Sequence, residues 1–263
     1  IFNNSDDYSG STLALGAFFF AFQIYGDFSG YSDIAIGTSR LFGFRLMKNF
    51  AFPYFSRDIA EFWRRWHISL STWFRDYLYI PLGGSKGGTM MKIRNTFIIF
   101  IVSGFWHGAN WTFIVWGALN AMFFLPLLLA KRNRQNLEVV ARGRIFASGK
   151  EILSILLTFC LTLIAWIFFR AENLSHAFDY LGGLFDGSLF SVPELNAIGA
   201  VWSIFAALAF FIVVEWFGRD NEHAIEKIGE NWKRPVRWSF YYAIMLSIII
   251  LRGEQQEFIY FQF

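Results

Sequence analysis

The residue best suited to chemistry is His107, which lies in residues 105–111 (FWHGANW) with apolar segments on both sides. An ionisable side chain inside a membrane-like apolar stretch is costly, so its presence there indicates a functional role. Imidazole exchanges a proton near neutral pH, which suits general base catalysis. The small neighbours Gly104, Gly108 and Ala109 predict a close approach by a substrate or another helix. The alternative is a histidine that packs between helices and bonds to a carbonyl group.

A second histidine, His67, lies in residues 56–78 (SRDIAEFWRRWHISLSTWFRDYL), where large apolar side chains recur at three- and four-residue steps among charged ones. This pattern predicts one amphipathic helix that is too charged to span a bilayer and therefore lies at the interface or re-enters it. Ser56 is the expected N-cap of this helix. Glu61 is expected to pair with a member of the Arg64–Arg65 dipeptide one turn later.

On that predicted helix, His67 shares a face with Trp63, Ser71 and Phe74, at the edge of the apolar stripe. A histidine that only anchors the helix at the membrane interface is the alternative. Two histidines in separate segments suit a proton relay or the orientation of one substrate. Their spacing in the sequence leaves open whether they meet.

Residues 25–33 (YGDFSGYSD) bring polar groups into an otherwise apolar stretch. Asp27 and Asp33 point to different faces of a helix, so they do not predict a paired-carboxylate site. Asp33 shares a face with Ser29, and Arg40 continues that face. We therefore expect a buried ion pair or a helix cap here rather than catalysis.

Several other chemistries lack their sequence signatures. The chain has no G-x-x-x-x-G-K-[ST] phosphate loop and no G-x-S-x-G nucleophile elbow. The 4 histidines lack H-x-x-x-H spacing and Cys160 is the single cysteine, which predicts no zinc site and no disulfide within the chain. The basic residues lie among membrane segments, so they indicate topology rather than nucleic-acid binding.

The composition is that of an integral membrane protein. Hydrophobic residues make up 55% of the chain and charged residues 16%, against about 45–50% and about 25% in soluble domains. The 34 Phe and 11 Trp residues suit lipid contact and the bilayer interface. The apolar residues gather in runs of roughly membrane-spanning length, which predicts an all-α, polytopic membrane fold.

The apolar runs also predict the elements that position the histidines. Residues 12–44 predict one long or kinked helix, loosened at Gly26 and Gly30. Residues 95–130 are too long for one straight span, since such a helix would run about 53 Å against a hydrocarbon core of about 30 Å. A broken helix is therefore expected, with the histidine of residues 103–110 at the bend. Basic flanks place both ends of the pair on the cytoplasmic side.

The rest of the chain predicts an alternation of loops and spans. Segments rich in Lys and Arg favour the cytoplasm, which sets the direction of each span. The predicted order is a cytoplasmic loop (131–150), an outward span (152–169), an external segment (170–195) with a short amphipathic piece (176–185), an inward span (197–217), a second cytoplasmic loop and a last outward span (237–252). Residues 1–263 thus predict a single membrane-embedded domain.

Three blocks of the sequence resemble the membrane-bound O-acyltransferases. They are residues 25–37 (YGDFSGYSDIAIG), 62–84 (FWRRWHISLSTWFRDYLYIPLGG) and 104–117 (GFWHGANWTFIVWG), with further matches at WIFFRAENL from Trp166 and at FIYFQF, 258–263. The branch that looks most similar is the bacterial alginate O-acetylation proteins, with the teichoic-acid D-alanyl transfer proteins as relatives. Family members usually carry several more helices before the first block, so the chain is expected to be the C-terminal half or more of a longer protein.

The resemblance implies a helical bundle of the membrane-bound O-acyltransferase (MBOAT) type. Such a protein is an O-acyltransferase, which transfers an acyl group to a hydroxyl. The functional histidines of the family map to His107, as the catalytic base, and to His67, as the second functional position. Asn110 or nearby backbone N–H groups would stabilise the oxyanion. The expected substrate contacts are Asn110, Trp106, Trp66 and Ser71.

The resemblance favours an acetylated, alginate-like exopolysaccharide as acceptor, a multi-pass location in the plasma (inner) membrane, and partner proteins of a polymer acetylation complex. The donor would be acetyl-CoA or a carried acyl group, used as co-substrate, with no bound cofactor or metal. D-alanyl or other acyl transfer to a cell-wall polymer is one alternative. A transporter or flippase of an acyl or glycan carrier is another, since broken helices also serve transport. A non-catalytic scaffold, and an acyl-histidine intermediate as mechanism, also stay open.

Overall fold

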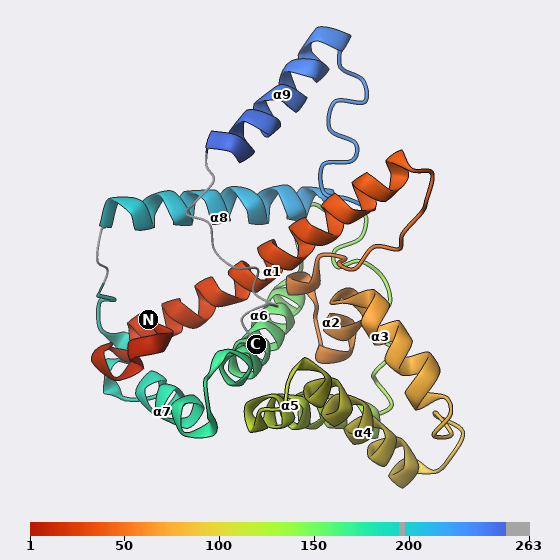
Figure 1. Cartoon of the computed structure of the whole chain (residues 1–263), viewed down its shortest axis with the longest axis vertical. Helices are drawn as coiled ribbons and strands as arrows, with labels where there is room; N and C mark the ends of the chain where they lie inside the picture. The colour runs from red at the N-terminus through yellow and green to blue at the C-terminus, as the bar shows by residue number, and fades with distance from the viewer. Residues whose placement is uncertain (195–197, 251–263) are drawn as a thin grey trace. The chain divides into compact units, whose positions relative to one another are not determined.

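The computed structural model describes residues 1–194 and 198–250, and over these residues the chain forms helices and loops (Figure 1). The block at 258–263 therefore lies outside the described residues. The chain divides into two compact units, Ile1–Ser203 and Ile204–Phe263. Unit 1 contains both candidate histidines.

The first long element is α1, Gly10–Leu41, a continuous helix of 32 residues. At 1.5 Å per residue it runs about 48 Å, as predicted for residues 12–44. The helix continues through Gly26 and Gly30 without a break. A short 3-10 helix, η1 (Phe2–Asp7), precedes it.

The segment predicted as one amphipathic helix is broken in two, and that prediction is wrong. Its parts are α2, Ile59–Arg65, and α3, Ile68–Phe74, followed by a π-helical turn, η3, Arg75–Tyr79. The break comes at Trp66 and His67. Trp66 is extended and His67 adopts the left-handed conformation (φ 43°, ψ 57°), so the two short helices cannot be continuous.

The predicted N-cap of this segment is also wrong. The cap of α2 is Asp58, whose side chain accepts a hydrogen bond from the backbone N–H of Glu61. Ser56 instead donates its hydroxyl hydrogen to the carbonyl of Pro53, at 2.6 Å, within the turn that contains η2, Pro53–Phe55. Asp is as good a cap as Ser, and Asp58 is the residue directly before the first helical turn.

The predicted break in the long apolar stretch is confirmed. Helix α4, Thr89–His107, ends at the histidine, and α5, Trp111–Leu129, begins after a three-residue turn. The two helices pack together as a hairpin through glycines. A Cβ atom added at Gly104 would collide with the carbonyl oxygen of Phe113, and one added at Gly117 with that of Phe100. Small residues thus let the two backbones touch, as expected for helices that associate in a membrane.

The remaining elements of unit 1 are α6, Gly149–Arg170, α7, Leu174–Leu184, and the 3-10 helix η4, Gly187–Phe190. Helix α6 begins with a capping box between Ser148 and Glu151. Its bounds confirm the helix predicted at 152–169, and α7 covers the short amphipathic piece predicted at 176–185 except for its last residue, Phe185.

Helix α8, Ile198–Gly218, crosses the boundary between the units, and α9, Arg234–Ile250, lies in unit 2. Within the described residues, three helices are long and apolar enough to cross a membrane: Trp111–Leu129, Gly149–Arg170 and Val201–Gly218. Helix α9 is outside this set, and residues 251–252 lie outside the described residues, so the predicted span over 237–252 stays a prediction.

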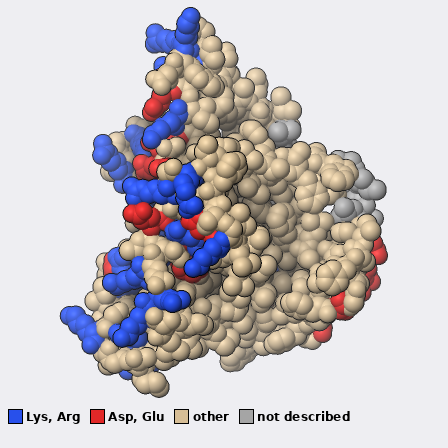
Figure 2. All heavy atoms as spheres, turned by 180° about the vertical axis from the view of Figure 1, so that it is seen from behind, with Lys and Arg blue, Asp and Glu red and all other residues tan. Residues whose placement is uncertain are grey.

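Charge is spread unevenly over the face shown in Figure 2. Most of this face carries no charged side chain, and many of the Lys and Arg side chains that it shows have Asp or Glu side chains close to them. A largely uncharged surface is typical of a protein that meets lipid.

Candidate active site

The two candidate histidines contact the same indole ring. The ring centroid of Trp106 lies 5.0 Å from that of His107 and 6.4 Å from that of His67, both edge-on. Trp106 is 53% exposed, so this ring is accessible from outside the described chain. The structure therefore brings together two side chains that the sequence places in separate segments.

His107 is held by aromatic side chains from two neighbouring helices. Its ring centroid lies 5.2 Å from that of Trp116 on α5 and 5.0 Å from that of Phe169 on α6. The residue itself is half-buried. A Cβ atom at Gly108 would stand 2.7 Å from the Phe113 ring, so a side chain at this position would require that ring to move. The predicted close approach at the glycines is thus made by α5.

His67 occupies the break between α2 and α3. Its ring packs edge-on against Phe28 of α1, with the ring centroids 4.7 Å apart. Burial lowers the pKa of the His67 imidazole from 6.5 to about 4, because the charged form loses its hydration. The ring is therefore neutral at physiological pH. A left-handed conformation at a non-glycine residue costs about 1–3 kcal/mol and persists only where neighbours hold it.

Asn49 supplies the hydrogen bonds that hold this break. Its backbone carbonyl accepts a hydrogen bond from the backbone N–H of Ile68 at 2.9 Å. Its side-chain Oδ1 accepts from the backbone N–H of Ser69 at 3.1 Å and from the Ser69 hydroxyl at 2.6 Å. His67 makes no side-chain cap to α3, so Asn49 caps this helix from outside. Sequence reasoning missed Asn49 and Ser69, because no local pattern links them.

The block at residues 25–33 contacts the segment around the break through uncharged side chains. Ser32 accepts a hydrogen bond from Asn49 Nδ2 at 3.3 Å. Asp27, Asp33 and Arg40 are all exposed, which contradicts the prediction that an ion pair here is buried, whereas the alternative of a helix cap stays a prediction. The helix face that packs on the segment around His67 carries the aromatic ring of Phe28 and the hydroxyl of Ser32.

The predicted substrate contacts have different placements. Trp66 is 2% exposed, and its ring centroid lies 5.0 Å from that of Trp166, which favours a packing role. The Ser71 hydroxyl donates to the carbonyl of Trp66 at 3.3 Å, so Ser71 supports the break. Trp106 is exposed between the histidines, where a substrate contact stays a prediction.

Asn110 is engaged at both ends of its side-chain amide. Oδ1 accepts from the backbone N–H of Thr112 at 3.1 Å and caps α5. Nδ2 donates to the carbonyl of Glu172 at 2.8 Å. The side chain therefore fixes the turn after His107 and ties it to the segment after α6.

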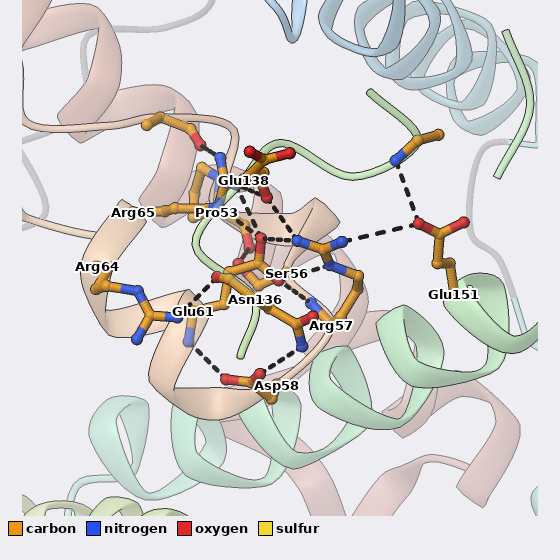
Figure 3. A network of polar contacts seen from close by, with 12 residues as sticks. Pro53, Ser56, Arg57, Asp58, Glu61, Arg64, Arg65, Asn136, Glu138 and Glu151 are labelled. Carbon is orange, nitrogen blue, oxygen red and sulfur yellow. Dashed lines mark hydrogen bonds and ion pairs between the residues drawn. The ribbon is translucent and has the colours of Figure 1, made fainter. Parts of the chain in front are cut away.

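A buried carboxylate fixes α2 next to the break (Figure 3). Glu61 is 1% exposed and forms ion pairs with Arg65 at 2.8 Å and with Arg57 at 3.0 Å. Of the two predicted partners of Glu61, Arg64 and Arg65, the ion pair with Arg65 is thus confirmed. Arg65 also donates to the carbonyl of Ala51 at 3.1 Å, and the N–H of Ala51 donates back to the carbonyl of Arg65. The segment around Asn49 is therefore held from both sides of the break.

The same helix is tied to the basic loop, which we define as residues 131–147 between α5 and α6. Arg64 donates to the carbonyls of Asn133 and Asn136, each at 2.9 Å. The Asn136 amide donates to the carboxylate of Asp58 at 2.7 Å. Arg57 reaches the carbonyl of Glu138. The loop and α2 thus form one hydrogen-bonded layer, part of which Figure 3 shows.

Comparison with known proteins gives the chemical context of this site. The model of the membrane-bound O-acyltransferase family, MBOAT, matches residues 7–169, which include both histidines. The protein named "Probable alginate O-acetylase AlgI" from Pseudomonas aeruginosa is 42% identical over 82% of this chain and 41% of its own length. The "Peptidoglycan O-acetyltransferase" of Helicobacter pylori is 33% identical over 93% of this chain and 48% of its own length.

Over a smaller part of its length, the chain is also similar to an enzyme named for the transfer of a different acyl group. The "Teichoic acid D-alanyltransferase" of Streptococcus thermophilus is 40% identical over 39% of this chain and 26% of its own length. The chain spans about half the length, or less, of these curated relatives.

Proposed function

The chain belongs to the membrane-bound O-acyltransferase family, and from this premise we propose that the whole protein transfers acetyl groups to hydroxyls of an exopolysaccharide. It is a membrane protein, with three described helices long and apolar enough to span a bilayer. The observation that carries the proposal is the meeting of His67 and His107 at one exposed indole. Similarity to the alginate O-acetylases supports the acceptor class.

In the proposed mechanism, neutral His107 is the general base. It takes the proton of a sugar hydroxyl as the oxygen attacks the carbonyl carbon of the acyl donor. The new ester C–O bond forms, the bond from the carbonyl carbon to the donor breaks, and the imidazolium returns the proton to the leaving group. General base assistance contributes about 10²–10⁴-fold. Holding both reactants at one site adds the gain from proximity.

The proposed oxyanion donors are backbone N–H groups in the turn between α4 and α5. The side-chain amide of Asn110 already donates to Glu172, which makes it the weaker candidate. Donors fixed in advance stabilise developing charge without reorganisation, and this turn is fixed by the Asn110 cap. An acyl-histidine intermediate is the alternative course at the same site.

We also propose a membrane location, an acyl donor and partner proteins for the whole protein. We place the whole protein in the inner (plasma) membrane as a multi-pass protein, with acetyl-CoA or a carried acyl group as co-substrate. It needs no bound cofactor or metal for this mechanism. Partner proteins of a polymer acetylation complex would deliver the acyl group and the chain to be modified. Similarity to a D-alanyltransferase supports acyl transfer to a cell-wall polymer as the second candidate function.

The test uses the full-length protein in cells that make the polymer. His107→Ala and His67→Ala are each expected to lower the acetyl content of the polymer at least 100-fold, because the base or its companion is lost. The control is His223→Ala, a histidine of unit 2. Unchanged acetylation with His107→Ala, at wild-type amounts of protein in the membrane, would refute the catalytic role. Loss of polymer export as well as acetylation would instead favour a transporter.

A further inference from the structure

The orientation of the Asn49 side chain is fixed by its partners. The backbone N–H of Ser69 can only donate, and it lies 3.1 Å from one atom of the Asn49 amide. That atom must therefore be the oxygen, Oδ1. The opposite atom, Nδ2, then lies 3.3 Å from the hydroxyl oxygen of Ser32, which can accept from it. The Ser69 N–H thus decides the orientation of the amide, and the contact with Ser32 is compatible with it.

The Ser69 hydroxyl has one hydrogen, and Asn49 takes it. Ser69 Oγ lies 2.6 Å from Asn49 Oδ1, an atom that cannot donate. The hydroxyl hydrogen must therefore point to Asn49. Toward any other neighbour, Ser69 Oγ presents a lone pair and acts as an acceptor.

That other neighbour is the ring of His67. Its Nδ1 atom lies 3.5 Å from Ser69 Oγ, a long contact that only an N–H donor on the ring makes favourable. With the hydrogen on Nε2 instead, two lone pairs would face each other. Which nitrogen of a neutral histidine carries the hydrogen is commonly set in this way, by the bond that the other nitrogen makes.

We propose that Asn49 and Ser69 are positioning residues that hold His67 in one tautomer, with the hydrogen on Nδ1 and the lone pair on Nε2. Nε2 is then a hydrogen-bond acceptor. It suits a group that brings a donor hydrogen, such as the hydroxyl of the acceptor sugar, and not the carbonyl oxygen of an acyl donor. This assignment of a partner rests on the proposed function, whereas the tautomer does not.

The tautomer is read directly by nitrogen NMR. The full-length protein, labelled with ¹⁵N-histidine, is placed in lipid bilayers, and the His67 signals are identified by their loss in His67→Gln. The expected result is a protonated Nδ1 and an unprotonated Nε2 at pH 7.5. Ser69→Ala is expected to shift the equilibrium toward a hydrogen on Nε2. The hydrogen on Nε2 in the wild type, or no change in Ser69→Ala, would overturn the proposal.

Three further variants separate this effect from a general loss of structure. Asn49→Asp keeps the acceptor oxygen and is expected to keep the wild-type tautomer, whereas Asn49→Ala is expected to lose it. Thr96→Val is the matched control, because it removes a buried hydroxyl that bonds only within its own helix turn in the described structure. If Ser69→Ala does not fold, Asn49→Ala compared with Asn49→Asp gives the same decision.

An activity measurement then tests the role of the tautomer. Ser69→Ala is expected to raise KM for the acceptor about tenfold, with a smaller change in kcat, as for the loss of one binding hydrogen bond. An unchanged KM alongside a shifted tautomer would refute the hydroxyl as partner. Wild-type NMR with the predicted tautomer, together with active His107→Ala protein, would refute the proposed function while leaving the tautomer in place.

Discussion

Glu61 and Arg65, one turn apart in α2, form a buried ion pair in which the carboxylate is 1% exposed and the N–O distance is 2.8 Å. A second arginine, Arg57, pairs with the same carboxylate at 3.0 Å. The charge on Glu61 is therefore compensated twice, and removing it would leave two partly buried guanidinium groups without their common partner.

Glu61→Gln is expected to destabilise the protein by about 3–5 kcal/mol, the usual cost of breaking a buried ion pair from one side. The midpoint of thermal unfolding in detergent measures it. Asp76→Asn is the control, since Asp76 pairs with Arg75 at the surface, where an ion pair contributes about 0–1 kcal/mol. Equal shifts for the two variants would contradict the structural role of Glu61.

The hairpin of α4 and α5 depends on the absence of a side chain at Gly117. Gly117→Ala is expected to destabilise the protein by about 1–3 kcal/mol, since its Cβ would meet the backbone of Phe100. Gly37→Ala, on α1, is expected to raise stability by about 0.4–1 kcal/mol, because nothing lies within 4 Å of its Cβ. Thermal unfolding of both variants gives the comparison, and shifts of the same sign would refute this packing.

Asn110 is predicted to act through its cap. Asn110→Ser keeps an N-cap and is expected to retain most acetylation activity, whereas Asn110→Ala is expected to lose about 1 kcal/mol of stability. Polymer acetyl content and unfolding midpoints check these outcomes. If Asn110→Ser lost as much activity as His107→Ala, the side chain would be an oxyanion donor, and the structural role would fail.

The buried His67 predicts a pH dependence of stability. Its pKa is about 4 when folded and 6.5 ordinarily, so the unfolded chain binds more protons between these values. Stability is therefore expected to fall as the pH falls from about 6.5 toward 4. His67→Gln should lessen the difference between unfolding midpoints at pH 7.5 and pH 5, and His223→Gln should not. An unaltered difference in His67→Gln would show that His67 is not buried as described.

The hairpin could be predicted from sequence because its signals are local. The apolar stretch was too long for one span, and the small and polar residues around His107 marked where it breaks. Asn110, directly before α5, is a good capping residue at the position where a cap is needed. The helices at 12–44 and 152–169 were likewise readable from apolar runs.

The break at His67 could not be predicted in this way. Large apolar residues continue at helical spacing through Trp66 and His67, so the periodicity favoured one helix. What stabilises the break is Asn49, far upstream in the sequence, and a long-range capping contact leaves no local pattern. In residues 25–33, the prediction rests on the carboxylates, because charged groups are unusual in an apolar stretch. The contacts with the segment around the break are instead made by Phe28, which packs on His67, and by Ser32, which bonds to Asn49.

His67 links two short helices that are attached to different parts of the chain. Helix α2, on one side, is fastened to the basic loop through Arg64 and Asp58, whereas the start of α3, on the other, is fastened to α1 through Asn49. Ala51, two residues after Asn49, also exchanges hydrogen bonds with Arg65 of α2, so the segment around Asn49 connects the two short helices. The backbone that carries the imidazole is therefore fastened at once to α1, to the basic loop and to the segment around Asn49.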